Sequence, residues 1–329
     1  MSFIAVLLAL IIEQLRPLPQ SNPVHEGLVA WSRWTGRNFD AGEEHHAWVV
    51  WVVTVVAPSL LVGLVFVLIH HYSDTLALVW NLVVLYLTLG FRQFSHYFTD
   101  IREALEEGRE DRARDLLQTW RNLDASELPR TELLRHVLEH GLLSAHRHVF
   151  GVFFWFVLSS AVGLGPTGAV LYRLAEFSSR YWGYKSRMLD APTNERLMRC
   201  AQRSFAIIDH VPARLTATGF AIVGNFEDAI DCWRNQAHLW LIGNDGVVLS
   251  TAAGAMGVAL GGQHAPELKP HLTRTFEAGA VPEEASAEGS TPGAVPQVGH
   301  LRAVVGLVWR SVVLWMLLLA LFGVVRLVG

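Results

Sequence analysis

The stretch LGFRQFSHYFTDIREALEEGREDRARDLLQTW, residues 89–120, marks where the chain changes from apolar to charged. No Asp, Glu, Lys or Arg occurs in residues 75–91, whereas acidic and basic side chains are frequent from Arg92 onward. Arg92 and His96 are four residues apart, so a helix places both on one face. Apolar residues then recur at helical spacing, and Gly108 interrupts them midway. We therefore predict a membrane helix that leads into a water-facing hairpin of two helices.

The composition is typical of a membrane protein. Of the 329 residues, 51% are hydrophobic and only 17% are charged, and the apolar residues are clustered in long runs. The formal net charge of −4 argues against a nucleic-acid-binding surface. Cys200 and Cys232 form no CxxC pattern, which argues against a disulfide framework or a zinc knuckle. The first residues lack a basic region and a cleavage site, so we expect the first apolar segment to be retained.

Several apolar runs are candidates for transmembrane helices. Residues 47–69 are the clearest, with 23 residues and no Asp, Glu, Lys or Arg. The uncharged residues 75–91 follow so closely that the two runs must form an antiparallel hairpin. Further runs lie at residues 149–164 and 301–328, while the run at 3–12 is short for a span. We predict an all-α, polytopic integral membrane protein with about four to six transmembrane helices and amphipathic helices on the cytoplasmic side.

Other helices are expected between these runs. Residues 130–143 have the pattern of an amphipathic helix. The glycines and proline of residues 163–168 break the apolar pattern, and residues 169–177 are expected to run back as a short apolar helix. Residues 180–203 are basic, which places them on the cytoplasmic side by the positive-inside rule. Residues 211–226 are expected to form a moderately apolar helix.

We divide the chain into three parts. Residues 1–262 form a membrane domain, within which residues 92–148 are a charged helical insertion. Residues 263–300 are rich in Pro, Gly, Ala, Ser and Glu without periodicity, which predicts a disordered linker. Residues 301–329 are a C-terminal transmembrane helix. Small residues dominate residues 247–262, so this helix is expected to pack closely, and a second copy of the chain is one partner it would suit.

One motif has the spacing of a metal site. His136, Glu139 and His140 match an H-x-x-E-H pattern, in which the two histidines share a helix face. A third acidic ligand is not identifiable, and the alternative is a solvated, histidine-rich helix end. We therefore predict no bound metal. No Walker A, GxGxxG or GxSxG motif occurs, which argues against a phosphate-binding loop or a hydrolase nucleophile elbow.

Motifs in order along the chain resemble those of the CobD/CbiB family, membrane proteins that attach an aminopropanol arm to the corrin ring during cobalamin assembly. The most specific match is Val211-Pro212-Ala213-Arg214-Leu215-Thr216, which resembles the family's PARLTA run. The other matching runs are Leu89-Gly90-x-Arg92-x-x-x-His96, Gly165-Pro166-x-Gly168-Ala169-x-x-Tyr172-Arg173, Gly183-Tyr184-Lys185, and Asn244 with the Ala/Gly-rich residues 253–262. The resemblance implies the localisation, a multi-pass protein of the bacterial inner membrane.

The chain departs from the family at acidic positions. Leu143, Ser144 and Arg147 stand where a second acid, Asn and Asp are expected, and the runs at residues 176–180 and 248–250 each lack an expected carboxylate. A second set of motifs comprises Leu7-Leu8-x-Leu10-x-x-Glu13-x-Leu15, Phe154-Trp155, Gly165-Pro166 and Val211-Pro212-Ala213-Arg214-Leu215. These motifs resemble those of AmpE-type proteins, which are linked to β-lactamase induction. We therefore expect a non-synthase sensor or regulator of the cell envelope. The alternative is an enzyme of the adenosylcobinamide-phosphate synthase type, for which the resemblance would imply Mg, a nucleotide and a corrinoid; the regulatory interpretation implies no cofactor.

The resemblance also implies a ligand site, although it assigns no catalytic residue. These residues are expected to converge on a cationic cavity that binds an anionic small molecule. They are Arg92, His96, Glu139, Tyr184, Lys185, Arg214 and Asn244. The other expected partner of the chain is the lipid bilayer.

Overall fold

The computed structural model describes residues 2–15, 23–39, 44–89, 91–121, 125–126, 128–188, 194–240, 242–262 and 289–328. Within these ranges every regular element is a helix, so the prediction of an all-α protein is confirmed. The chain forms two compact units. The first unit is built mainly from Met1–Gly90 and Arg147–Pro212, and the second mainly from Phe91–His146 and the residues that follow Ala213.

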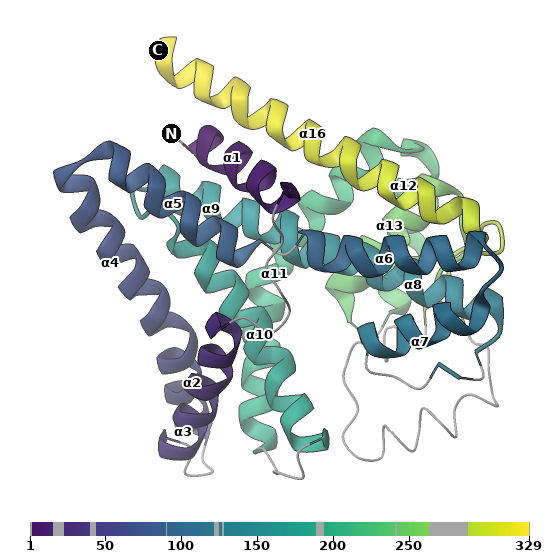
Figure 1. Ribbon diagram of the computed structural model, residues 1–329, viewed down its shortest axis with the longest axis horizontal. Helices are drawn as coiled ribbons and strands as arrows, with labels where there is room; N and C mark the ends of the chain where they lie inside the picture. The colour runs from purple at the N-terminus through teal and green to yellow at the C-terminus, as the bar shows by residue number, and fades with distance from the viewer. Residues whose placement is uncertain are drawn as a thin grey trace. The chain divides into compact units, whose positions relative to one another are not determined.

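The first unit contains most of the early apolar helices (Figure 1). They are α1 (Ser2–Leu15), α2 (Pro23–Phe39), α3 (Glu44–Trp51), the π-helical η1 (Val52–Val56), α4 (Ala57–Tyr72), α5 (Asp74–Thr88), α9 (Gly151–Ala161) and α10 (Thr167–Met188). The predicted hairpin of residues 47–69 and 75–91 is confirmed by α4 and α5. Ser73 joins them, and its side chain caps α5 by accepting a hydrogen bond from the Leu76 N–H.

A glycine-rich turn reverses the chain between α9 and α10. Gly163 and Gly165 have φ angles of 83° and 54°, in the left-handed region that favours glycine. The Ser159 hydroxyl donates to the Gly165 carbonyl at 2.7 Å and accepts from the Gly168 N–H at 3.1 Å, so the turn's backbone is hydrogen-bonded. The predicted return helix is therefore present. It is longer than the expected residues 169–177, because the charged residues after Phe177 continue the helix to Met188.

The second unit begins with the predicted helical hairpin. It is formed by α6 (Phe91–Glu106) and α7 (Glu110–Arg121), with Gly108 at φ 75° between them, which confirms the two-helix reading of residues 92–120. The next helix, α8 (Arg130–Ala145), is not amphipathic as expected. Its residues 133–139 and 141–145 are buried on every side. The reason is tertiary, because α6, α7, α13 and α16 all pack against it.

The remaining helices of the second unit are α12 (Phe226–Gln236), the 3₁₀ turn η3 (Ala237–Leu239), α13 (Gly243–Met256) and α16 (Val298–Val328). The small residues of α13 pack within the chain, with a close approach of Gly254 to the backbone of Asp228 and Ala229 in α12. This is the close packing predicted for residues 247–262, although here the neighbour is a helix of the same chain. The expected helix at residues 211–226 is instead the second half of a longer helix, α11 (Glu195–Val223).

The structure describes only the last part of the predicted linker of residues 263–300. Residues 263–288 lie outside the described residues. Residues 289–297, in contrast, are placed by backbone pairing: Val258 bridges to Ala294 and Gly261 bridges to Ser290. The C-terminal helix then begins at Val298 rather than at residue 301. The prediction of a linker through residue 300 is therefore wrong for its last part, because these residues complete their backbone hydrogen bonds against residues 258–262.

Three described helices are long and apolar enough to cross a membrane: His46–Tyr72, Arg130–Ala161 and Val298–Val325. Two shorter apolar helices, Phe3–Leu15 and Asp74–Thr88, accompany them. The first and third spans agree with the runs predicted from the sequence. The second differs, because α8, the π-helical η2 (His146–Phe150) and α9 form one continuous helix through a segment that was expected to be partly water-facing. These helices show that the chain is an all-α membrane protein.

Candidate functional site

A ladder of charged residues lies along one face of α10 in the first unit. Arg173, Glu176 and Arg180 are spaced three and four residues apart, which places them on the same side of the helix. Arg173 Nη1 lies 3.0 Å from Glu176 Oε2, and the Arg180 guanidinium is paired with Glu176 Oε1. The Glu176 side chain is only 1% exposed, whereas those of Arg173 and Arg180 are 22% and 38% exposed. Glu176 therefore pairs with two arginines whose side chains are partly exposed.

A second pair joins α10 to α11 beside this ladder. The Tyr172 hydroxyl donates to Asp209 Oδ1 at 2.7 Å, and both residues are buried. Arg147 of η2 is also buried and lies near enough for its charge to act on Tyr172 and Arg173. We call these six residues the α10 network: Arg147, Tyr172, Arg173, Glu176, Arg180 and Asp209.

The α10 network is chemically unusual for the interior of a membrane protein. A buried carboxylate is costly unless it is paired or hydrogen-bonded; Glu176 is paired with two arginines, and Asp209 accepts a hydrogen bond from Tyr172. Counting Arg147, Arg173 and Arg180 against Glu176 and Asp209, the formal charges sum to one positive charge. A guanidinium has five N–H donors in a planar fork, which suits a phosphate or a carboxylate. The arrangement can therefore bind and orient an anionic group.

The seven ligand-site residues predicted from the sequence do not belong to the α10 network. In the second unit, Arg214 Nη1 donates to Asn244 Oδ1 at 3.3 Å, so the structure brings this predicted pair together. His96 is an exposed residue of α6, and its ring lies 3.5 Å from the Asp100 carboxylate. The side chains of Arg92, Tyr184 and Lys185 lie outside the described residues, so the expected convergence of all seven residues stays a prediction.

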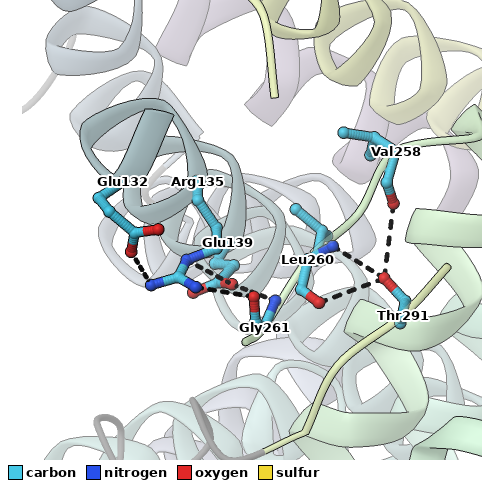
Figure 2. A network of polar contacts seen from close by, with 7 residues as sticks. All are labelled: Glu132, Arg135, Glu139, Val258, Leu260, Gly261 and Thr291. Carbon is cyan, nitrogen blue, oxygen red and sulfur yellow. Dashed lines mark hydrogen bonds and ion pairs between the residues drawn. The ribbon is translucent and has the colours of Figure 1, made fainter. Parts of the chain in front are cut away.

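Glu139, also predicted, takes part in a clamp on the backbone of residue 261 (Figure 2). Its Oε1 accepts from the Gly261 N–H at 2.7 Å, while Arg135 Nη1 donates to the Gly261 carbonyl at 2.8 Å. Arg135 is also paired with Glu132 one turn earlier on α8. Thr291 extends the clamp, since its hydroxyl accepts from the Leu260 N–H at 2.8 Å. We call these contacts the Gly261 clamp, and they hold backbone rather than a ligand.

Two residues of the H-x-x-E-H motif, Glu139 and His140, make structural contacts within the chain. The His140 ring meets Trp120 edge to face, with centroids 4.4 Å apart. Glu139 is engaged by the Gly261 N–H, as described above. His136 is buried on α8. The described part of the chain contains no group of three or more His, Cys, Asp or Glu side chains arranged to hold a metal ion.

The sequence contained signals for the α10 network that the prediction did not use. Tyr172 and Arg173 belong to a run that resembles the family pattern. Glu176 and Arg180 lie in the run that lacks an expected family carboxylate. The spacing of Arg173, Glu176 and Arg180 is the signal that identifies one helix face. The pairing of Tyr172 with Asp209 has no local signal, because it joins residues 37 positions apart.

Comparison with known proteins identifies the family of this chain. The family model described as CobD/Cbib protein matches residues 3–286. A protein of Stutzerimonas stutzeri (strain A1501) named Cobalamin biosynthesis protein CobD is 31% identical over 332 aligned residues, covering 98% of this chain and 97% of the relative. A protein of the same name from Chromobacterium violaceum is 35% identical over 190 residues, covering 57% of each chain. No solved structure gives a significant match. The chain belongs to the CobD/CbiB family.

Proposed function

We propose that this protein acts in cobalamin biosynthesis as a synthase of the adenosylcobinamide-phosphate type. The reaction forms an amide between a corrinoid carboxylic acid and an aminopropanol derivative. The observation that carries the proposal is the match, along 98% of the chain, to a relative named Cobalamin biosynthesis protein CobD. The two relatives carry the biosynthetic name, so the AmpE-like regulatory interpretation expected from the sequence has no support from them.

The main objection to a synthase was the loss of family carboxylates, and the α10 network weakens it. The run at residues 176–180 lacks the expected Asp, yet Glu176 supplies a buried carboxylate from the same stretch of helix. Asp209 supplies a second one. A chain that had lost all need for charge here would be expected to replace these groups with apolar ones, because buried ion pairs often add little stability.

In this proposal the network binds and orients an anionic group of a substrate. Arg173 and Arg180 donate hydrogen bonds to the anion, while Glu176 positions their guanidinium groups by pairing with both of them. Asp209 fixes the direction of the Tyr172 hydroxyl. Holding one reactant in place lowers the entropic part of the barrier to amide formation. A nucleotide would supply the activation of the carboxylic acid when it is bound.

The described residues do not fit a metal ion held by the protein alone. Mg²⁺ in nucleotide enzymes is bound by one or two carboxylates together with substrate phosphates. Glu176 is engaged by two arginines and Asp209 by Tyr172. We therefore assign no step of the reaction to a metal held by these side chains.

The proposed location is the bacterial inner membrane, in which the protein crosses the bilayer several times.

Complementation tests this proposal. A cobalamin-requiring strain that lacks its own synthase is given this gene and supplied with cobyric acid. Growth is expected, and it should be lost in Arg173→Ala but largely retained in Arg199→Ala, an exposed arginine of an i,i+4 pair on α11. Cobinamide, which enters after the missing step, is the control that the strain can grow. Growth on cobinamide but not on cobyric acid, with the protein present in the membrane fraction, would exclude the synthase function.

A further inference from the structure

Helix α11 (Glu195–Val223) is not among the three apolar spans, yet its exposed surface is apolar over part of its length. Its first nine residues carry exposed charges, including Glu195, Arg199 and Arg203. From residue 204 to residue 223 no Asp, Glu, Lys or Arg is fully exposed, because Asp209 is buried and Arg214 is half-buried and donates to Asn244 Oδ1. Beyond it, the exposed Asn225 caps the next helix and Glu227 follows. A 20-residue segment therefore lies between two charged or polar boundaries.

Four large apolar residues of this segment form one exposed stripe. Ile207, Val211, Leu215 and Ile222 are 73%, 48%, 39% and 55% exposed. Their spacing of four, four and seven residues keeps them on one side of a 3.6-residue helix. Thr218 lies on the same side, and its hydroxyl donates to the Arg214 carbonyl, so it is satisfied within the helix. His210 is the one exposed titratable residue in the segment.

The buried side of the same segment carries the polar residues. Ser204, Asp209 and Thr216 are 4%, 1% and 1% exposed. Each has a hydrogen bond: Ser204 to the Cys200 carbonyl, Asp209 from Tyr172, and Thr216 with His146 Nδ1 at 2.9 Å. A helix that faces water shows the opposite arrangement, with its apolar residues inside and its polar residues outside. Ionisable residues of membrane helices, in contrast, almost always face the protein interior.

We infer that residues 204–223 of α11 form a further transmembrane helix, whose stripe of Ile207, Val211, Leu215 and Ile222 contacts lipid. At 1.5 Å per residue, 20 residues extend about 30 Å, which is the thickness of the hydrocarbon core. The protein already has three helices suited to a bilayer, so lipid is the apolar phase available to this stripe. The average hydropathy of the segment is lower than that of the three apolar spans because Asp209, His210 and Arg214 lie near its middle. Asp209 would consequently lie within the depth of the membrane, on the protein side of the helix.

Site-directed spin labelling of the full chain in phospholipid vesicles tests the inference. Single cysteines are placed at each of the four stripe positions in a Cys200→Ser, Cys232→Ala background. Collision rates with oxygen, which concentrates in lipid, and with a water-soluble nickel chelate are then measured. We expect high oxygen and low nickel accessibility at all four positions, as at Leu317 of α16, which is 63% exposed on a recognised span. Gln118, exposed on α7, is the water-facing control.

Two results would overturn the inference. Nickel accessibility equal to that of Gln118 would show that the stripe faces water. Low accessibility to both reagents would show that protein covers it, whether a second copy or another partner. If a cysteine variant does not fold, a photoreactive benzophenone side chain at the same position in the native background replaces it. Cross-linking to lipid is then expected, and cross-linking to protein without lipid adducts would contradict the inference.

Discussion

The Trp155 indole N–H donates to the Ile208 carbonyl at 3.1 Å. Ile208 lies four residues before Pro212, and in a regular helix its carbonyl would accept from the N–H of residue 212. Proline has no N–H, so that hydrogen bond cannot form. Trp155 of α9 supplies the missing donor. Helix α11 therefore passes through its internal proline without leaving this carbonyl unsatisfied.

This relationship predicts a coupled pair of substitutions. Trp155→Phe should lower the free energy of unfolding by about 1–3 kcal/mol, since it leaves a carbonyl without its donor. In a Pro212→Ala background the alanine N–H can donate to the same carbonyl, so Trp155→Phe should cost less there. Thermal or denaturant unfolding in detergent measures all four proteins of the cycle. Trp48→Phe is the control, because Trp48 is 53% exposed. Equal costs in both backgrounds would show that the two residues are not coupled.

We expect residues 265–286 to be dispensable for stability, because the residues on either side of this segment are bonded to each other. The Gly262 N–H donates to the Gly289 carbonyl at 2.9 Å, so the two ends of residues 263–288 are joined by a hydrogen bond. Replacing residues 265–286 with a short Gly-Ser linker should therefore change the melting temperature little. Size-exclusion behaviour and thermal unfolding in detergent check this.

A longer deletion is the matched comparison. Removing residues 270–295 also removes Thr291, whose side chain and backbone both bond to Leu260. It would also remove the pairing of Ala294 with Val258. We expect this protein to be clearly less stable than the shorter deletion. Equal stability of the two proteins would contradict a structural role for residues 289–294.

The charge of Glu176 is expected to stabilise the folded protein. Glu176→Gln keeps the shape but removes the charge that Arg173 and Arg180 share. It should lower the free energy of unfolding by roughly 1–3 kcal/mol, less than for a fully buried pair, because both arginine side chains are partly exposed. Glu195→Gln is the control, since Glu195 forms a comparable i,i+4 pair with Arg199 but is 82% exposed. Its effect should be within about 0.5 kcal/mol. Equal effects of the two substitutions would contradict a special role for the α10 network.

The Cys232 thiol is expected to react slowly at neutral pH. Burial, and then the Asp231 and Asp228 carboxylates, raise the pKa of this thiol above its ordinary value. Because the thiolate is the reacting form, the fraction available at pH 7 is reduced and grows as the pH approaches the raised pKa. Alkylation of a Cys200→Ser protein, followed by mass spectrometry from pH 7 to pH 9.5, should show a steadily rising rate. The same protein in denaturant, which reacts as an ordinary thiol, is the control; equal rates in both states at pH 7 would refute the shift.

Much of the fold followed from local patterns in the sequence. The apolar runs at residues 47–69 and 301–328 predicted helices that the structure places at residues 46–72 and 298–325, and the charged repeat interrupted by Gly108 predicted the hairpin of α6 and α7. These features depend on side-chain spacing over a few turns and on the cost of burying charge in lipid, so neighbouring residues suffice to reveal them. The prediction that α8 is amphipathic was wrong because local spacing does not reveal that α13 and α16, from distant parts of the sequence, pack against it together with α6 and α7.

Only the tertiary structure decided where the polar groups meet. Tyr172 and Asp209 are 37 residues apart, and Arg135 and Gly261 are 126 apart, so no local periodicity links them. The same holds for the faces of α11, whose pattern of polar and apolar residues has the same helical period whether its apolar side faces protein or lipid. Hydrophobic spacing fixes which residues share a face of a helix, but the direction of that face depends on the surfaces that pack against it.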